Sequence, residues 1–175
     1  MTSQLTFVLI VAVAGLHERR AWATPADAQI AGAYKYVGGP AEVKALLSAI
    51  EPVVKKMSWV SRGIARSRLR KGNLPTQEMR ILIDAGAIHI VRPGRPTVAA
   101  PADGRSQKWK SSDGVFDVTH AFKDGRLIQT IDGKNSHSTN EFVLAGDGVT
   151  LTVHTRITSP RLPGAVVFRM TYRKK

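Results

Sequence analysis

The spacing of hydrophobic positions changes twice along this 175-residue chain. Residues 29–39 alternate between apolar and polar side chains and end at a pair of glycines, which predicts a short strand. Residues 40–51 then show the i, i+3, i+4, i+7 spacing of an amphipathic helix, with apolar positions at Val43, Leu46, Leu47 and Ile50. Pro52 ends that helix or opens a second one, because proline is tolerated at the first position of a helix.

The second helical pattern runs to Gly72-Asn73 and contains WVSRGIARSRLRKGN, a stretch with four arginines, one lysine and no acid. Its apolar positions form a stripe that we expect to face the protein, namely Val53, Met57, Val60 and Ile64. The basic positions that we expect on the solvated face are Lys55, Arg62, Arg66 and Arg70. Arg68 falls four residues after Ile64, so we expect it to point inward or along the rim of the fold.

After Pro75 the pattern becomes a series of short runs of β-branched and aromatic residues. Asp-Gly pairs occur between these runs, at residues 103–104, 113–114, 124–125, 132–133 and 147–148. Asp-Gly between alternating runs is a strong hairpin signal. Together with residues 29–39 these runs predict a mainly-β protein of about ten antiparallel strands. An up-and-down meander of this length closes most naturally into a barrel, because closure removes the exposed sheet edges.

The first 23 residues have the pattern of a secretory signal. Leu5–Leu16 is an apolar run that is too short for a membrane-spanning helix, which needs about 20 residues. The sequence AWA fits a cleavage site after Ala23. We therefore expect residues 1–23 to be a signal peptide and residues 24–175 to be one exported domain, periplasmic or secreted. The alternative is an uncleaved amphipathic anchor.

Charge and composition narrow the classes of partner and chemistry. The chain has 26 Lys and Arg against 13 Asp and Glu, a net charge of +13 that favours anionic partners. The lack of cysteine excludes thiol catalysis and cysteine-ligated zinc. Trp59 and Trp109 do not form the stacking row of a nucleic-acid-binding barrel, so nucleic acid is a disfavoured partner. Nucleophile elbows and phosphate-binding glycine loops are also missing, and the sequence indicates no enzyme class.

The predicted order of elements is one strand, a helical pair and nine further strands. This order resembles that of the fatty-acid-binding-protein branch of the calycins. In that family a helix-turn-helix between the first two strands caps a ten-stranded barrel. The resemblance implies a calycin-like barrel here, with a helical lid over about residues 41–71. Gly32-Ala33-Tyr34 is similar to the Gly-x-Trp signature of lipocalins, with tyrosine in place of tryptophan. RGIARSRLR and ITSPRLP are similar to segments of uncharacterised exported bacterial proteins.

The resemblance also implies an internal cavity for an apolar or amphipathic ligand. In the family an anionic head group is often held by an Arg-x-Tyr pair on the last strand. Here the corresponding residues are Met170 and Tyr172, so the arginine is missing from that pair. Arg156 on the preceding strand and Arg68 from the lid are the candidates to replace it. These residues are our ligand-binding candidates together with His120.

His120 lies on the same strand face as Phe116, Val118 and Phe122, so we expect it to point into apolar surroundings. One interpretation is a core histidine with a single hydrogen-bond partner. The other is a histidine that contacts a ligand or ligates haem, as in some bacterial calycins.

These observations favour an exported protein that reversibly binds an apolar or amphipathic, anionic small molecule without a cofactor. We expect a monomer whose basic helix face, Lys55, Arg62, Arg66 and Arg70, meets an anionic membrane surface. The alternatives are an interaction or inhibitor module without a cavity ligand, a haem carrier, and an enzyme that uses the barrel cavity.

Overall fold

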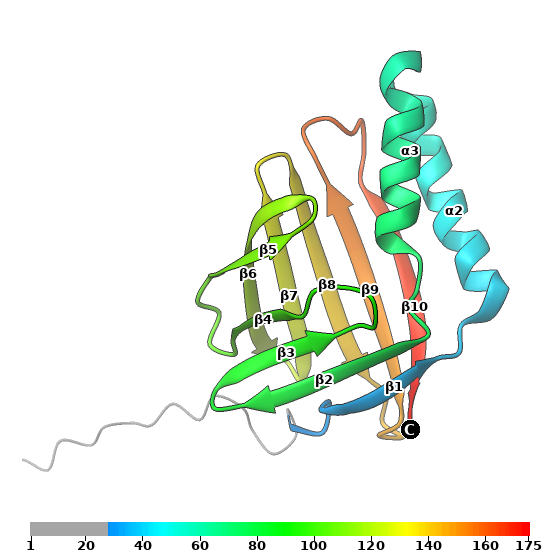
Figure 1. The fold of residues 1–175 in the computed structure, drawn as a ribbon. Helices are drawn as coiled ribbons and strands as arrows, with labels where there is room; N and C mark the ends of the chain where they lie inside the picture. Colours follow the sequence, from blue (N-terminus) through cyan, green and yellow to red (C-terminus); the bar gives the residue numbers. More distant parts are fainter. Residues whose placement is uncertain (1–27) are drawn as a thin grey trace, which may run out of the picture.

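The computed structural model describes residues 28–175, in which ten strands form a single antiparallel sheet (Figure 1). The strand order is β4-β3-β2-β1-β10-β9-β8-β7-β6-β5, and two helices lie between β1 and β2. This confirms the predicted meander with a helical pair after its first strand. The strands are β1 Gly32–Tyr36, β2 Glu78–Asp84, β3 Ala87–Val91, β4 Val98–Pro101, β5 Gln107–Ser111, β6 Gly114–Lys123, β7 Arg126–Gly133, β8 Ser136–Leu144, β9 Thr150–Thr158 and β10 Val166–Lys174. The predicted signal peptide, residues 1–23, lies outside the described residues.

The barrel is nearly closed, and its seam lies where β4 approaches β5 and β6. No ladder joins β4 to β5 within the described chain, and a single bridge connects Asp103 to Ala121. Two further hydrogen bonds cross the seam. The Gly104 N–H donates to the His120 carbonyl at 2.9 Å, and the Trp109 indole donates to the Thr97 carbonyl at 2.9 Å. The seam is therefore held by a few contacts, whereas every other pair of neighbouring strands shares a ladder.

The Asp-Gly pairs make turns in two ways. Asp124 and Gly125 have φ angles of 52° and 71°, as the tight two-residue hairpin between β6 and β7 requires. Asp147 acts through its side chain, which accepts hydrogen bonds from the backbone N–H groups of Val149 and Thr150. These bonds, and one from the Thr150 hydroxyl, lower the pKa of Asp147 to about 2.

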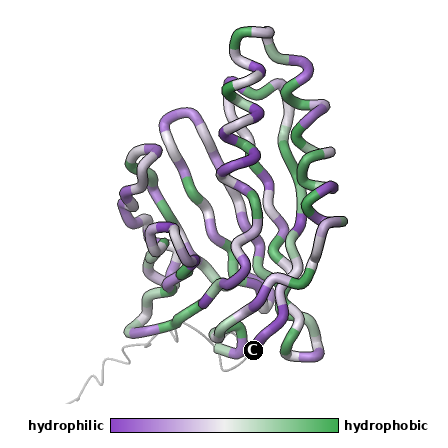
Figure 2. Tube along the Cα trace, turned by 45° about the vertical axis from the view of Figure 1, so that its right-hand side comes forward, coloured by the Kyte–Doolittle hydropathy of each residue, from purple (hydrophilic) through white to green (hydrophobic). Residues whose placement is uncertain are grey.

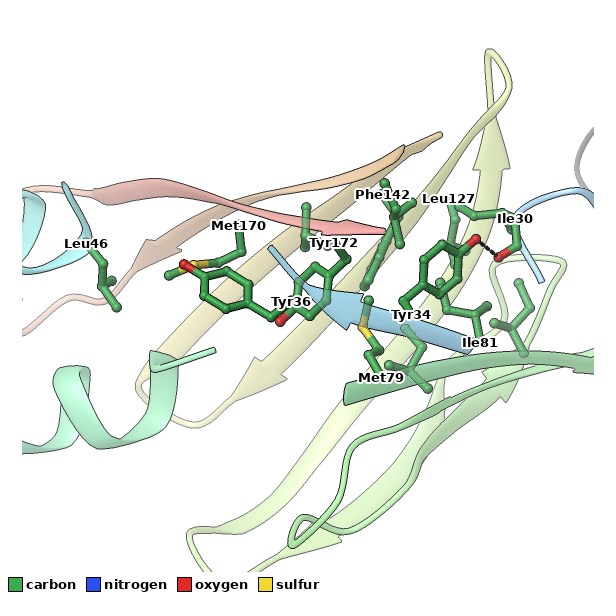
Figure 3. Close-up of a cluster of buried hydrophobic side chains, with 14 of the residues drawn as sticks. Ile30, Tyr34, Tyr36, Leu46, Met79, Ile81, Leu127, Phe142, Met170 and Tyr172 are labelled. Atoms are coloured by element: carbon green, nitrogen blue, oxygen red, sulfur yellow. Dashed lines mark hydrogen bonds between the residues drawn. The ribbon is translucent and has the colours of Figure 1, made fainter. Parts of the chain in front are cut away.

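Apolar side chains at alternating positions of the strands form the core cluster. Hydrophobic and hydrophilic positions alternate along the chain trace in Figure 2. Tyr34 is fully buried, and its hydroxyl donates to the Ile30 carbonyl at 2.6 Å (Figure 3). The rings of Tyr36 and Tyr172 meet edge to face, with centroids 5.5 Å apart. The other large buried side chains include Leu46, Met79, Ile81, Leu127, Phe142 and Leu151.

Helix α2, Gly39–Lys55, packs on β10 through an apolar face that includes Leu46, Ile50 and Val54. Glu42 in its first turn accepts hydrogen bonds from the backbone N–H of Thr171 at 2.8 Å and from its hydroxyl at 2.7 Å. Pro52 lies inside α2, which continues to Lys55, so it neither ends this helix nor opens the next. The burial of the valines at positions 53 and 54 holds this last turn against the barrel.

Helix α3, Trp59–Asn73, has no fully buried residue, and its predicted orientation is wrong. Val60 and Ile64 were expected to pack, yet they are 64% and 58% exposed. Ala65 and Leu69 instead pack on the core cluster. Neither helix in the described part of the chain is both long and apolar enough to cross a membrane.

Contacts made by the arginines of α3 accompany the observed orientation of this helix. Arg66 forms a bidentate pair with Glu51 of α2, with both N–O distances at 2.9 Å. Arg62 donates to the carbonyls of Lys55 and Met57 at 2.9 and 3.0 Å, where the helix end leaves acceptors free. Arg62 and Arg66 were predicted to be solvated, and they are instead half-buried between the helices. Charge-assisted bonds of this kind are stronger than neutral hydrogen bonds, and they hold this face of α3 against α2 while Val60 and Ile64 point to solvent.

Candidate ligand-binding site

The inward face of β10 carries two of the predicted ligand-binding residues. Met170 and Tyr172 are both 4% exposed and belong to the core cluster, whereas Arg169, which precedes Met170, is exposed on the outer face. The expected orientation of this strand is therefore confirmed. The arginines of β10, Arg169 and Arg173, both lie on its exposed face, so neither shares the inward face with Tyr172.

An arginine reaches Tyr172 from the other side of β1. Arg92 directly follows β3, and it continues the inward alternation of the buried residues Ile88 and Ile90. Burial is the main cause that lowers the pKa of Arg92, while the nearby Tyr172 hydroxyl opposes this effect. Among residues 28–175, no carboxylate pairs with Arg92 and no side-chain hydrogen bond satisfies it. Arg92 is thus a half-buried cation that lacks an anionic partner within the described chain.

The groups that act on Tyr172 include Arg92, the Thr76 hydroxyl and, more weakly, the Glu42 carboxylate. Burial raises the pKa of Tyr172, while Arg92 and the neighbouring Thr76 hydroxyl lower it. Burial and the nearby Glu42 raise the pKa of Tyr36 to about 12, and its hydroxyl donates to the Gly39 carbonyl at 3.0 Å. Both phenols are therefore neutral at physiological pH. One guanidinium with a phenol and a hydroxyl beside it suits a carboxylate or a similar anionic head group.

The loop that carries Arg92 is joined to the end of α3. Arg95 donates to the carbonyls of Gly72 at 2.7 Å and Leu74 at 3.2 Å, with a longer contact of 3.4 Å to Lys71. These carbonyls have no partner further along the helix, and a cation is favoured at this end of the helix dipole. Arg95 therefore fixes the end of α3 next to the loop that carries Arg92.

A row of buried polar side chains crosses the facing wall of the barrel. His120, Gln129, Asn140 and Thr155 lie directly opposite one another on β6, β7, β8 and β9. Gln129 Nε2 lies 2.8 Å from His120 Nε2, Asn140 Nδ2 donates to Gln129 Oε1 at 2.9 Å, and Thr155 Oγ1 donates to Asn140 Oδ1 at 2.8 Å. Two members are fully buried and the other two are 7% exposed. We call these four residues the polar row.

His120 is the last member of the polar row, next to the seam. An amide N–H of Gln129 donates to its Nε2, which places the imidazole proton on Nδ1. Burial lowers the pKa of His120 to about 4, against a smaller opposite effect of the Ile88 and Ala100 backbone. The predicted apolar surroundings and hydrogen-bond partner are thus confirmed. His120 does not fit a haem ligand, because iron would have to displace Gln129 from Nε2 inside a fully buried site. Within residues 28–175, no three His, Asp or Glu side chains are grouped to hold a metal ion.

The other predicted site residues lie on the outer surface. Arg156 is exposed on the outer face of β9, and Arg68 is exposed on α3, so the expected inward orientation of Arg68 is wrong. The face of α3 that would have turned Arg68 inward is the one that carries Val60 and Ile64, which also point to solvent. Lys55 and Arg70 are exposed, as predicted. Neither Arg156 nor Arg68 is therefore close to the buried Tyr172 side chain.

The residues that the sequence analysis missed share one signal. Each is a polar side chain on the inward face of a strand, alternating with apolar positions. Gln129 follows Leu127, Asn140 precedes Phe142, and Thr155 follows Val153, each with a single outward residue between them. Arg92 follows Ile90 in the same way. A search for polar residues in phase with buried ones identifies all four.

Two open hollows occur at the end of the barrel where the helices turn. One, of about 270 Å³, lies between the α2–α3 turn and the β9–β10 loop, and Lys56, Met57, Ser58 and Arg161 are among its lining residues. The other, of about 400 Å³, lies between the β7–β8 turn and the end of β9. Neither hollow includes Arg92 or the polar row among its lining residues.

No protein-family model and no curated protein sequence matches the chain, whereas solved structures with low sequence identity share its architecture. A secretory abundant heat soluble protein from Ramazzottius varieornatus aligns over 84% of this chain and 96% of its own, with a TM-score of 0.56 and 13% identity. Zebrafish ileal bile acid-binding protein, solved with cholic acid, aligns over 84% and 99%, with a TM-score of 0.51 and 16% identity. Fatty-acid-binding protein 1 from Echinococcus granulosus aligns over 83% and 97%, with a TM-score of 0.50 and 16% identity. The chain therefore has the calycin-like fold of fatty-acid-binding proteins, a nearly closed ten-stranded barrel with two helices between its first strands.

Proposed function

We propose that this protein is an exported carrier that reversibly holds one amphipathic anion in its barrel, without a catalytic step. The head group binds Arg92 and Tyr172, and the apolar part lies among the side chains of the barrel interior. The observation that carries this proposal is Arg92 itself. A half-buried guanidinium without a carboxylate partner is costly, because burial removes water from a charge that nothing else neutralises. An anionic ligand supplies that missing partner.

The shape of the molecule and its charge support the same proposal. Two proteins with this architecture are described by their names as binding fatty acids and bile acids. The net charge of +13 favours the approach of anions from solution. The apolar interior provides burial for a ligand tail, at about 25 cal/mol per Å² of apolar surface removed from water.

Stearate binding to an Arg92→Gln variant tests the head-group site. A hydrogen bond to a charged group contributes about 1.5–3 kcal/mol, so we expect stearate affinity to fall by about one to two orders of magnitude. Arg169→Gln is the matched control, because Arg169 is exposed on the outer face of β10 and should leave affinity unchanged. Displacement of a fluorescent fatty-acid analogue measures both. Equal affinities of the two variants, or no saturable binding of stearate or cholate to the parent protein, would refute the proposal.

An anionic membrane surface is the partner that we propose for the outer face of α3. Trp59 is 84% exposed, and Val60 and Ile64 lie beside it on the solvent side of the helix. Exposed basic residues follow on the same helix, namely Arg68, Arg70 and Lys71. Apolar side chains together with a basic cluster suit the interface of an anionic bilayer, where each basic residue adds about 1 kcal/mol. This surface replaces the predicted one, since Arg62 and Arg66 bind within the helical pair.

Vesicle sedimentation tests this surface with two variants. Replacing Arg68, Arg70 and Lys71 by glutamine should weaken binding to phosphatidylglycerol-containing vesicles on the order of a hundredfold at low salt. Trp59→Ser combined with Ile64→Ser should weaken binding at every salt concentration, because apolar burial is not screened. Val167→Ser is the control, as Val167 is also exposed but lies on β10. Equal binding by the parent protein to phosphatidylcholine vesicles would refute an electrostatic partner.

A further inference from the structure

The polar row has a consistent direction of hydrogen bonding. Thr155 donates to Asn140, Asn140 donates to Gln129, and Gln129 donates to His120. Each bond joins residues that are paired in register, so the strands hold the donors and acceptors in place. The bonds within the row compensate only part of the cost of placing polar atoms in the apolar wall, because each side-chain amide keeps an N–H that the row does not use.

The polar row has hydrogen-bond donors that are not used within the row. Each side-chain amide has two N–H donors, and Gln129 and Asn140 each use one of them within the row. His120 Nδ1 is buried without a hydrogen bond of ordinary geometry, although the backbone of Ala100 and Ile88 lies close enough to raise the pKa of His120. The carbonyl oxygens of Gln129 and Asn140 each already accept one bond. The groups left over in the row are therefore mainly amide N–H donors, which an acceptor oxygen on a ligand would satisfy.

The two polar groups of the interior come from different parts of the barrel. Arg92 directly follows β3 and Tyr172 lies on β10, on either side of β1 and β2, whereas the row crosses β6 to β9. The core cluster includes apolar side chains of both walls, such as Tyr34 and Phe142. A molecule that reaches both groups must be charged at one end, apolar along its body and polar again at a second point.

We propose that the polar row is a second subsite, which binds a hydroxyl or carbonyl oxygen in the body of the ligand. The ligand class is then an oxygenated amphipathic anion, such as a hydroxylated fatty acid, rather than a plain fatty acid. This inference rests on the proposed function, since it assumes that an anion enters the barrel. The row selects for oxygen because a plain alkyl chain leaves its buried donors unpaired, whereas an oxygenated chain satisfies them.

The experiment compares stearate with its mid-chain hydroxylated and keto analogues by isothermal titration calorimetry on the full mature chain. We expect at least one oxygenated analogue to bind about tenfold more tightly than stearate, the equivalent of one net hydrogen bond. Equal affinities, or tighter stearate binding, would overturn the second subsite while leaving the proposed carrier intact. If none of the three anions binds, the carrier itself fails, so the two failures are distinguishable.

Variants of the polar row separate recognition from folding. Asn140→Leu removes one donor that the ligand would use, and it should abolish the preference for the oxygenated analogue while stearate affinity changes little. Thr155→Val removes only the hydroxyl at the end of the row, keeps both amides, and should retain the preference. If Asn140→Leu does not fold, the imidazole NMR signals of His120 in the parent protein provide the test of the second subsite. They should shift with the oxygenated analogue and not with stearate, and identical shifts with both would contradict the proposal.

Discussion

The arginines of this protein show how differently one residue type behaves at different depths. Arg66 is half-exposed and paired with Glu51, which raises its pKa. Arg92 is half-buried without such a partner, and burial lowers its pKa. Arg68 is exposed on the surface. The helical positions of Arg66 and Arg68 predicted the reverse, with Arg66 solvated and Arg68 inward. The observed difference arises because Glu51 on α2 pairs with Arg66 and not with Arg68.

The burial of His120 should make the free energy of unfolding depend on pH. Its folded pKa of about 4 lies below the ordinary 6.5, so the unfolded chain binds the proton more tightly. The corresponding stability is fully present above about pH 6.5 and is lost as the pH falls toward about 4. We expect the free energy of unfolding to decrease by about 3 kcal/mol over this range. Urea titrations at several pH values measure it.

His120→Gln is the control for this pH dependence, since it removes the titrating group and keeps a side chain that can hydrogen-bond. The variant should lose the slope between about pH 6.5 and 4, whatever its stability at neutral pH. Asp147, with a pKa of about 2, contributes only below this range, where its stabilising effect is lost as the pH falls. An unchanged slope in the variant would show that another group is responsible.

At the scale of elements, the two helices are held in different ways. α2 buries four residues and is anchored to β10 through Glu42, whereas α3 buries none completely. α3 is fixed by polar contacts at its ends, from Arg62 near its beginning and Arg95 near its end. The period of the apolar residues was sufficient to predict both helices. It was not sufficient to predict the orientation of α3, because its partners are carbonyl groups and a carboxylate that no hydrophobic pattern reveals.

The Arg66–Glu51 pair should contribute to the docking of α3. We expect Arg66→Gln to lower the thermal unfolding midpoint, because α3 has few apolar contacts to replace the bidentate pair. Arg70→Gln, on the exposed face of the same helix, should leave the midpoint unchanged. Differential scanning calorimetry compares the two variants. Equal midpoints would contradict the prediction, because they would mean that water replaces the Arg66–Glu51 pair without loss of stability.

Hydrogen exchange should distinguish the two helices directly. Backbone amides in the middle of α3 should exchange much faster than those of α2, because local opening of α3 exposes little apolar surface. Exchange measured by mass spectrometry on peptides from each helix tests this. Arg95→Gln should accelerate exchange at the end of α3 further, since it removes the bonds to Gly72 and Leu74. Equal protection of α2 and α3 would contradict this description of the lid.

For the whole molecule, the sequence was informative about architecture and less so about the interior. Asp-Gly turns and alternating runs predicted the ten strands, and Met170, Tyr172 and His120 were placed on their correct faces. Arg92 was missed because it sits at the end of a strand beside Pro93-Gly94, where a turn role is the ordinary expectation. The other members of the polar row, Gln129, Asn140 and Thr155, were missed because they meet His120 and one another only after four separate strands are in register.

Export is a property of the whole chain, and it remains a prediction. In a bacterial host with a secretory pathway, the mature protein should begin at Thr24, because AWA precedes this position. Amino-terminal sequencing of the periplasmic fraction measures this. Soluble cytoplasmic protein that retains Met1 would contradict it.

β1 lies between β2 and β10, so the first strand of the sheet completes its pairing only when the last one arrives. During synthesis, every chain that stops short of Val166–Lys174 leaves one edge of β1 and one edge of β9 without a neighbour. The sheet therefore cannot be completed strand by strand as the chain is synthesised, because the pairing of β1 with β10 must form last.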